Sequence, residues 1–247
     1  MDYNQITKMY YSKWLGINKT LCDVDGIEFI YSPERNLTQF GYSQPFDIYC
    51  FYQTNRIIVS YGEKAKEKIE IFKGKLNSHT SVDELKKEII DVYGVIPHHN
   101  IKFFFNSLPR ENKIARTLTL DDYNPYRDFF KKCNPSCGNT DWVQDYFCEM
   151  ISDRVCVGVF VEGMIVSCTD SPGMPYMQDQ VQEIGVNTLS DYRGKGYASA
   201  ACILCAKNII DNGKCPLWST DTNNTVSERL AYKVGFIRFA DVLTITI

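Results

Sequence analysis

The chain has 247 residues, of which 44% are hydrophobic and 23% are charged. This balance is typical of a folded globular protein and excludes an intrinsically disordered one, and the length suffices for one large domain or two of about 100–150 residues. The formal net charge of −3 disfavours a dedicated nucleic-acid binder, which usually carries a basic excess that neutralises phosphates.

No stretch approaches the roughly 18 apolar residues of a membrane span, and the start, MDYNQITKMYYSKWL, lacks the apolar segment of a signal peptide. We therefore expect a cytoplasmic protein with no membrane and no nucleic-acid partner. The ten cysteines are expected to be reduced thiols that pack as small hydrophobic side chains. No metal is expected, because neither close pair, Cys133 with Cys137 or Cys202 with Cys205, has a second pair to match it.

Residues 1–114 have a mixed pattern. A helix is expected over residues 2–15, and the segments 26–32 and 46–61 are rich in β-branched and aromatic residues, which indicates strands. The second of these segments is expected to fold back as a hairpin at its Thr-Asn pair. The charged run 62–75 mixes both signs and indicates a solvated surface.

A capping pattern marks the next element. Ser81 and Glu84 form a capping box, so residues 81–94 predict an amphipathic helix that ends at a glycine. His98 and His99 follow a proline in an expected loop, and we assign them no metal or catalytic role.

A polar stretch at 107–117 is the expected boundary between an N-terminal α+β domain of unknown role, residues 1–114, and a second domain, residues 115–247. The second domain is expected to alternate strands and helices. Its predicted elements are a strand before 123, a helix over 123–133, a hairpin over 155–171, a strand over 181–189, a helix over 195–210, a strand over 215–221, a helix over 225–235 and one or two closing strands over 236–247.

The junction YRGKGYASA lies where the strand over 181–189 gives way to a helix. The first turn of a helix presents unsatisfied N–H groups and the positive end of the helix dipole, which suit a phosphate. Gly194 and Gly196 let the anion approach the backbone, and Arg193 and Lys195 add charge. The stretch matches neither the Walker loop nor the dinucleotide fingerprint, and taken alone it is also compatible with a glycine-rich turn that carries ordinary surface charges.

A second pattern follows downstream in NTVSERLAYKVGF. Thr225 and Glu228 are spaced as a capping box, and Gly235 is expected to end the helix. Asn224 stands just before the helix, where its amide could reach a ligand in the groove between the two helices.

With both patterns, the chain resembles the GNAT acyltransferase superfamily. EIGVNTLSDYRGKGYASA is similar to its acyl-coenzyme-A motif, and NTVSERLAYKVGF is similar to its second cofactor motif, in which an asparagine precedes a helix that ends in Gly-Phe. The resemblance covers residues 115–247 and implies an α/β (α+β) fold. In that fold a mixed, mostly antiparallel sheet is flanked by helices, and the coenzyme lies where two neighbouring strands splay apart.

The resemblance also implies which residues bind coenzyme A. The pantetheine arm would run along Val186, Asn187 and Thr188 through backbone groups, and Asn224 and Ser227 would contact it from the second helix. The pyrophosphate would be held by Arg193, Gly194, Lys195, Gly196, Tyr197 and Ala198.

Transfer of an acyl group to an amine needs a base for the ammonium proton and an acid for the leaving thiolate. Glu183, on the strand before the motif, is the candidate base. The family often has a tyrosine that acts as the general acid, and Ala231 stands at that position here. Tyr232 is the next residue, and it lies about 100° further around the helix, so it should face elsewhere. Ser227, one turn earlier on the same face, is the candidate that orients a water or the sulfur. Tyr192, Tyr197 and solvent remain other proton sources.

The predicted activity is N-acetylation of an acceptor amine by direct transfer from acetyl-coenzyme A. A catalytically inactive coenzyme-A-binding regulatory module is the alternative, which Ala231 and the extra N-terminal region favour. A generic phosphate or RNA contact at RGKG is a third reading that the acidic balance disfavours. The acceptor is left open, with its pocket expected around Trp142, residues 174–178 and the N-terminal region; a homodimer is also left open.

Overall fold

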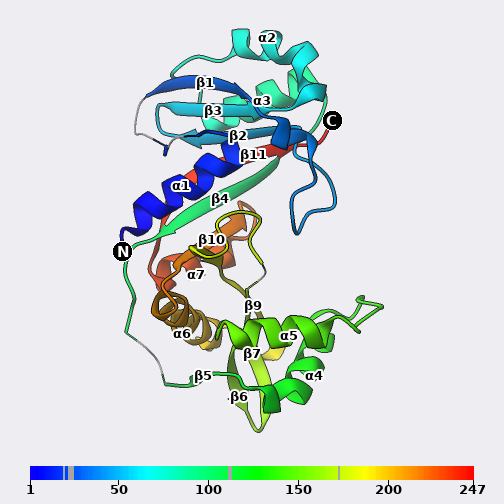
Figure 1. Cartoon of the computed structure of the whole chain (residues 1–247), viewed down its shortest axis with the longest axis vertical. Helices are drawn as coiled ribbons and strands as arrows, with labels where there is room; N and C mark the ends of the chain where they lie inside the picture. Colours follow the sequence, from blue (N-terminus) through cyan, green and yellow to red (C-terminus); the bar gives the residue numbers. More distant parts are fainter. Residues whose placement is uncertain (19, 22–24, 111–112, 172) are drawn as a thin grey trace.

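The structure, a computed structural model, describes residues 1–18, 20–21, 25–110, 113–171 and 173–247. A seven-stranded sheet has the order β1-β3-β2-β11-β4-β10-β8 and runs from the top of Figure 1 to its middle. Its neighbours are antiparallel apart from two parallel pairs, β1 with β3 and β8 with β10. The strands are β1 (Gly26–Tyr31), β2 (Ile48–Gln53), β3 (Arg56–Tyr61), β4 (His98–Phe105), β8 (Val181–Glu183), β10 (Cys215–Asp221) and β11 (Phe236–Ile245).

A second sheet of four antiparallel strands, in the order β5-β6-β7-β9, lies at the lower end of Figure 1. Its strands are β5 (Ala115–Thr117), β6 (Val157–Val161), β7 (Met164–Asp170) and β9 (Gly185–Thr188). The predicted hairpin is confirmed as β6 and β7, whose turn at Glu162 and Gly163 has φ angles of 51° and 78°. Both residues lie in the left-handed region that tight hairpin turns use.

The helices are α1 (Tyr3–Leu15), α2 (Lys66–Lys75), α3 (Val82–Tyr93), α4 (Tyr123–Cys133), α5 (Val143–Ser152), α6 (Tyr197–Asp211) and α7 (Thr225–Val234). α1 covers one face of the large sheet and α2 and α3 cover the other, whereas α4 and α5 lie with the small sheet (Figure 1). Side chains along β2 point alternately to the two faces of the large sheet. Tyr49 and Phe51 pack with α1 on one face, whereas Ile48 and Cys50 pack with α2 and α3 on the other. A third core, which includes Trp218 and Phe236, joins α6 and α7 to both sheets.

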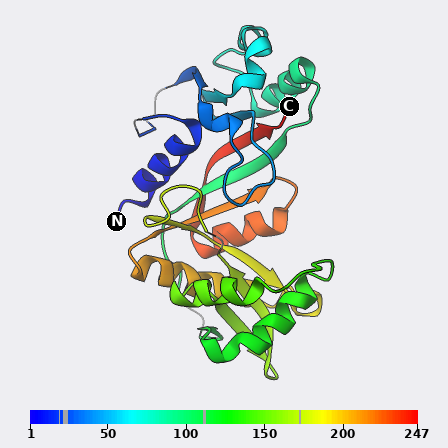
Figure 2. The same cartoon turned by 45° about the vertical axis from the view of Figure 1, so that its right-hand side comes forward.

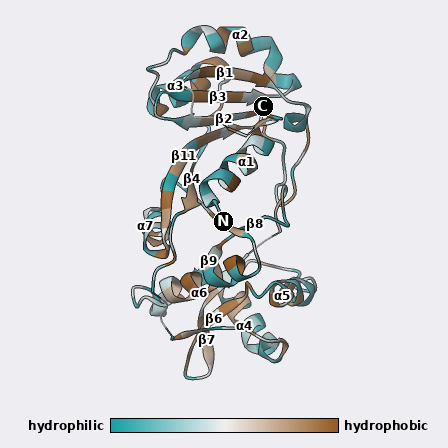
Figure 3. Cartoon of the chain, turned by 60° about the vertical axis from the view of Figure 1, so that its left-hand side comes forward, coloured by the Kyte–Doolittle hydropathy of each residue, from teal (hydrophilic) through white to brown (hydrophobic). Residues whose placement is uncertain are grey.

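Local sequence explains several of these elements. Ser81 caps α3, because its hydroxyl accepts from the N–H of Glu84 while the Glu84 carboxylate accepts from the N–H of Ser81, which confirms the predicted capping box. The hairpin of β2 and β3 turns at Asn55 with a φ of 64°. Figure 3 shows β1 and β3 largely in the hydrophobic colour, as expected for strands covered by helices.

The structure differs from several local predictions. His98 and His99 open strand β4 and are not in a loop, because the eight residues HHNIKFFF pair with both β10 and β11. The charged side chains of the run 62–75 are exposed, as predicted, but the run also contains helix α2, whose Ile69 and Phe72 are buried. Helix α5 was not predicted. The strand over 181–189 is broken into β8 and β9, which belong to different sheets.

Strands from both sides of residue 114 share the large sheet. β4 pairs with β10 on one edge and with β11 on the other, and β11 also pairs with β2. Figure 2 shows the late strands β10 and β11 following β4 through the middle of the molecule. The division at residue 114 thus runs through a continuous hydrogen-bonded sheet; residues 111–112 of the predicted boundary lie outside the described residues.

Candidate functional site

The N-terminus of α6 forms an open cradle of backbone groups. Gly194 and Gly196 have φ angles of 76° and 82°, a conformation that L side chains rarely adopt. A Cβ atom at either position would meet no atom within 4 Å, so the space beside the backbone is open. No side chain caps the helix, whose N-cap is Gly196. The first-turn N–H groups can therefore receive an anion such as a phosphate.

Two exposed cations flank this cradle. Arg193 donates from Nε to the carbonyl oxygen of Thr188 at 3.2 Å, which ties the loop to the end of β9. The Nζ atom of Lys195 lies 4.9 Å from the ring centroid of Tyr192, a cation–π contact. Both charges remain at the surface beside the start of α6, where they add to the helix dipole.

The two strands nearest the cradle part from each other. β8 runs parallel to β10 as far as Glu183, whose register partner is Leu217, and the N–H of Ile184 still donates to the carbonyl of Leu217 at 3.0 Å. β9 then leaves the large sheet and pairs with β7, so that Val186, Asn187 and Thr188 lie opposite Thr169, Cys168 and Ser167. The strand break thus separates β9 from β10, so that the two strands belong to different sheets beyond Ile184.

The start of α7 faces the end of β10. Asn224 is its N-cap, with its side-chain oxygen accepting from the N–H of Ser227 at 3.1 Å. The predicted capping box of Thr225 and Glu228 is therefore wrong, because the helix is capped one residue earlier. The hydroxyl oxygen of Ser227 accepts from Nε1 of Trp218 at 3.2 Å, which links α7 to β10.

No tyrosine of α7 reaches the region of Ser227. Ala231 is fully buried, and Tyr232 points outward, 47% exposed, where its hydroxyl donates to Glu228 at 3.3 Å. This orientation follows from the rotation of about 100° between successive helix residues.

Glu183 lines a cavity of about 450 Å³ on the face of the sheet that α1 covers. Its carboxylate accepts a short hydrogen bond from the hydroxyl of Ser219 on β10. The polar floor of the cavity comes from β4, β8, β10 and β11, with the residues His98, Asn100, Lys102, Glu183, Ser219 and Thr244. The aromatic wall comes from α1 and the segment before β3, with the residues Tyr10, Tyr11, Trp14, Tyr42, Phe46 and Tyr49.

Burial controls the ionisation of this cavity. Burial, and after it the charge of Glu183, raises the pKa of Tyr42 to about 12. The pKa values of Tyr10, Tyr11 and Tyr49 are raised well above 10 for the same main reason. These phenols are therefore neutral at physiological pH. Burial lowers the pKa of Lys102, and the charge of Glu183 opposes that shift.

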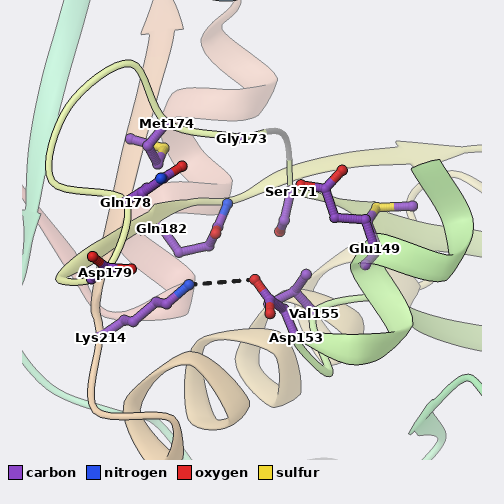
Figure 4. Close-up of a pocket in the computed structure, with 11 residues that line it drawn as sticks. Glu149, Asp153, Val155, Ser171, Gly173, Met174, Gln178, Asp179, Gln182 and Lys214 are labelled. Atoms are coloured by element: carbon purple, nitrogen blue, oxygen red, sulfur yellow. Dashed lines mark hydrogen bonds and ion pairs between the residues drawn. The ribbon is translucent and has the colours of Figure 1, made fainter. Parts of the chain in front are cut away.

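The loop residues expected at the acceptor pocket lie elsewhere. Trp142 packs edge-on against Phe130, with ring centroids 5.5 Å apart, at the N-terminus of α5. Met174 and Gln178 line a smaller cavity of about 210 Å³, in which Figure 4 shows the ion pair between Lys214 and Asp153 at 3.3 Å. Met174 nevertheless contacts Glu183, because its sulfur accepts from the backbone N–H of Glu183 at 3.3 Å.

Sequence reasoning missed most of the cavity residues, although one signal was present. In HHNIKFFF, the segment NIKF alternates polar and apolar residues, which places Asn100 and Lys102 on one face of a strand, with His98 two residues earlier on the same face. The aromatic residues of α1 carried no comparable signal, because aromatic side chains at helical spacing usually form a core.

Residues 48–241 match the family model named GNAT acetyltransferase. The chain belongs to the GNAT acetyltransferase family. The match begins at the start of β2, so it includes part of the N-terminal region, in which no family motif was recognised. A search of curated proteins finds no match.

Three solved structures of similar proteins align with the chain at low sequence identity. The GNAT-family acetyltransferase of Colwellia psychrerythraea aligns at 14% identity and a TM-score of 0.50, over 60% of this chain and 55% of that one. A GCN5-related N-acetyltransferase from Sphaerobacter thermophilus aligns at 16% identity and a TM-score of 0.49, over 64% of this chain and 54% of that one. The chain thus spans little more than half the length of these two proteins. A Salmonella typhimurium protein solved with acetyl-CoA aligns at 13% identity and a TM-score of 0.43, over 53% of this chain and 90% of that one.

The family and the fold confirm the predicted superfamily and the mixed, mostly antiparallel architecture. No helix within the described ranges is long and apolar enough to cross a membrane. Among the residues that the structure describes, no group of three or more His, Cys, Asp and Glu side chains is arranged to hold a metal ion.

Proposed function

We propose that the protein transfers an acetyl group from acetyl-coenzyme A directly to an acceptor amine. The observation that carries the proposal is the position of Glu183. It is the last residue of β8 before the strands part, and its side chain lines the cavity on the α1 face. The gap between β9 and β10 on one side and the cavity on the other would bring the two substrates together beside this carboxylate.

The chain offers groups that fit coenzyme A. The N–H groups at the start of α6, with Arg193 and Lys195, suit the pyrophosphate, and the open space beside Gly194 and Gly196 lets it approach the backbone. Tyr197 and Ala198 supply N–H groups of the first helical turn.

The rest of the coenzyme would lie in the gap between the strands. Val186, Asn187 and Thr188 would border the pantetheine arm along β9, and Asn224 and Ser227 would contact it from α7.

Acetyl-coenzyme A supplies an activated acyl carbon, whose C–S bond is exchanged for the C–N bond of the product amide. Glu183 would take the proton that the acceptor ammonium must lose before its nitrogen can attack, directly or through a water. Ser219 holds the Glu183 carboxylate by its hydrogen bond. Ser227 would donate to, or orient a water toward, the departing thiolate, because its oxygen already accepts from Trp218.

Two measurements test the proposal. Titration calorimetry is expected to show binding of acetyl-coenzyme A, and a thiol-release assay over a panel of amines is expected to show coenzyme A liberated only when an acceptor is present. Absence of binding at millimolar acetyl-coenzyme A would contradict the proposal.

The burial of Ala231 at the position of the family's tyrosine favours a second candidate, a regulatory module that binds coenzyme A without catalysis. That candidate predicts binding with no thiol release from any amine. Cytoplasmic location, a homodimer and the lack of a metal and of a nucleic-acid partner stay predictions from the sequence.

A further inference from the structure

The floor of the larger cavity holds a cation close to the candidate base. Glu183, Ser219 and Lys102 lie on three adjacent strands, β8, β10 and β4, in that order. Ser219 donates to Glu183, and Ser219 and Lys102 are direct register partners. All three side chains line the cavity. The carboxylate and the ammonium therefore stand side by side on the same face, separated by one strand.

Lys102 is only partly balanced by the protein. Within the described part of the chain no acidic side chain forms an ion pair with its Nζ atom, and its neighbours along β4 in the cavity, His98 and Asn100, carry no negative charge at neutral pH. Glu183, the acidic residue of the cavity lining, acts on Lys102 from the far side of β10, but burial outweighs its effect and lowers the pKa of Lys102. Because a partly buried ammonium that is not fully balanced is costly, it favours an anion supplied by a ligand.

A second buried cation stands behind the aromatic wall. The guanidinium carbon of Arg35 lies 5.5 Å from the ring of Trp14 and 5.4 Å from the ring of Tyr49, and both rings line the cavity. Arg35 is fully buried, and its three side-chain nitrogens have no hydrogen-bond partner among the described residues. Burial lowers the pKa of Arg35, and the preceding residue, Glu34, opposes part of that shift. The cavity thus has one carboxylate on its floor and positive charge on two sides.

We propose that the acceptor is a zwitterionic amine of the amino-acid type, with its amine at Glu183, its carboxylate at Lys102 and an apolar side chain against the aromatic wall. This inference rests on the proposed function and specifies its substrate class. A single ammonium matches the single charge of a carboxylate, whereas a phosphate dianion needs more donors. A volume of about 450 Å³ is in the range of small-molecule sites.

The same charges exclude polyamines and other polycationic acceptors. A second ammonium group in the cavity would lie near Lys102, and like charges repel strongly where water is excluded. Lys102 also favours the neutral form of the acceptor amine, because a neighbouring cation lowers the pKa of an ammonium group.

The test uses matched ligands and the full chain. Phenylalanine, tryptophan, leucine and methionine are each compared with their carboxamides and their decarboxylated amines, by thiol release with acetyl-coenzyme A and by calorimetry in the presence of coenzyme A. Each acid is expected to exceed its amide and its amine in kcat/KM and in affinity by about tenfold or more, the range of one charge-assisted contact.

Variants of Lys102 show whether that preference comes from its charge. In Lys102→Met the kcat/KM for each acid is expected to become nearly equal to that for its amide. In Lys102→Arg most of the preference for the acid is expected to remain. Lys68→Met, which removes an exposed lysine of α2, is the matched control and should retain the wild-type ratio.

The outcomes separate this inference from the proposed function. Thiol release with amides or polyamines at least as fast as with the acids overturns the inference and leaves acetyl transfer intact. If no acceptor amine causes the release of coenzyme A, the proposal of acetyl transfer is wrong, and calorimetry alone tests the inference. Tighter binding of the acids than of their amides and amines, with this preference lost in Lys102→Met, would then support it. Binding of none of the ligands, or a preference that survives Lys102→Met, overturns it.

Discussion

At the scale of single residues, Glu183 is defined by its neighbours on adjacent strands. Ser219 orients its carboxylate, Met174 accepts from its backbone N–H, and the phenols of the aromatic wall face it across the cavity. A carboxylate held in this way is suited to proton transfer, because its position relative to the acceptor amine is set before the substrate arrives.

Glu183→Gln removes the proton acceptor and retains the size of the side chain. We expect kcat/KM for acetyl transfer to fall by about a hundredfold or more, the usual contribution of a general base. The affinity for acetyl-coenzyme A should stay unchanged in calorimetry. Glu70→Gln, at an exposed position of α2, is the control and should match the wild type. Unchanged turnover in Glu183→Gln would show that another group takes the proton.

A second residue-scale prediction concerns stability in acid. Both carboxylate oxygens of Asp122 accept from Arg116 at 2.7 Å, and the N–H of Thr119 adds a third bond at 2.9 Å. The bond to Arg116 is the main reason why the pKa of Asp122 falls from 3.8 to about 2. The folded state thus holds this proton less tightly than the unfolded chain, so the stabilisation is complete above about pH 4 and is lost toward about pH 2.

Urea unfolding measured at several pH values tests this effect. Asp122→Asn is expected to be less stable at neutral pH and to lose less stability than the wild type between about pH 4 and pH 2. Asp121→Asn, at the exposed neighbouring position, should follow the wild-type curve. Parallel curves for Asp122→Asn and the wild type would show that the ion pair contributes nothing.

At the scale of elements, α6 joins the anion cradle to the core. Cys202, Cys205 and Ala206 are fully buried, and these small side chains let the helix lie close to the strands. The cradle at its start then lies beside the point where β9 and β10 diverge, because the loop before α6 follows β9 directly. The break after Glu183 is thus as important for the site as the glycines themselves.

The two ends of α6 offer a matched pair of variants. Gly196 and Gly213 have φ angles of 82° and 76°, and a Cβ at either meets no atom within 4 Å. Alanine at either position carries a similar backbone strain of about 1–2 kcal/mol. Gly196→Ala is expected to raise the Kd for acetyl-coenzyme A about tenfold or more, because the cradle must shift. Gly213→Ala should alter thermal stability alone. Equal effects of the two variants on the Kd would contradict the placement of the pyrophosphate.

At the scale of the whole molecule, the large sheet connects the two ends of the chain. β4 is flanked by β10 and β11, and its residues Phe103 and Phe105 pack in one core with Trp218 and Phe236. The cavity has the same origin, since its aromatic wall comes from residues 10–49 and Glu183 and Ser219 come from the other side of residue 114. The early segment therefore completes the cavity that we propose as the acceptor site.

A fragment of residues 115–247 should for this reason not fold alone. Without β4, strands β10 and β11 lose a shared neighbour and the aromatic core loses one of its layers. We expect no cooperative thermal transition and no near-ultraviolet circular dichroism from the fragment, and recovery of both on addition of residues 1–114. A cooperative transition of the fragment alone would support two separable domains.

The sequence by itself predicted the superfamily, most helices and the hairpins. These features depend on local signals: the capping box at Ser81 and Glu84, the turn at Glu162 and Gly163, and the RGKG string before α6. Each of these patterns spans only a few consecutive residues, so the sequence alone suffices to predict it. The coenzyme-A residues carried over from the motif stay predictions.

Tertiary structure alone decided the rest. Glu183 is the last residue of β8 in the large sheet, and the residues after it join the small sheet. This change depends on pairing with β10 and β7, which are distant in sequence, and no local pattern marks the break. The neighbours of Lys102 are likewise set by strand order, which places β4 between two late strands. Local chemistry thus predicted an anion site at the start of α6, whereas long-range strand pairing decided which residues face the candidate base, because non-local contacts leave no periodic pattern in the sequence.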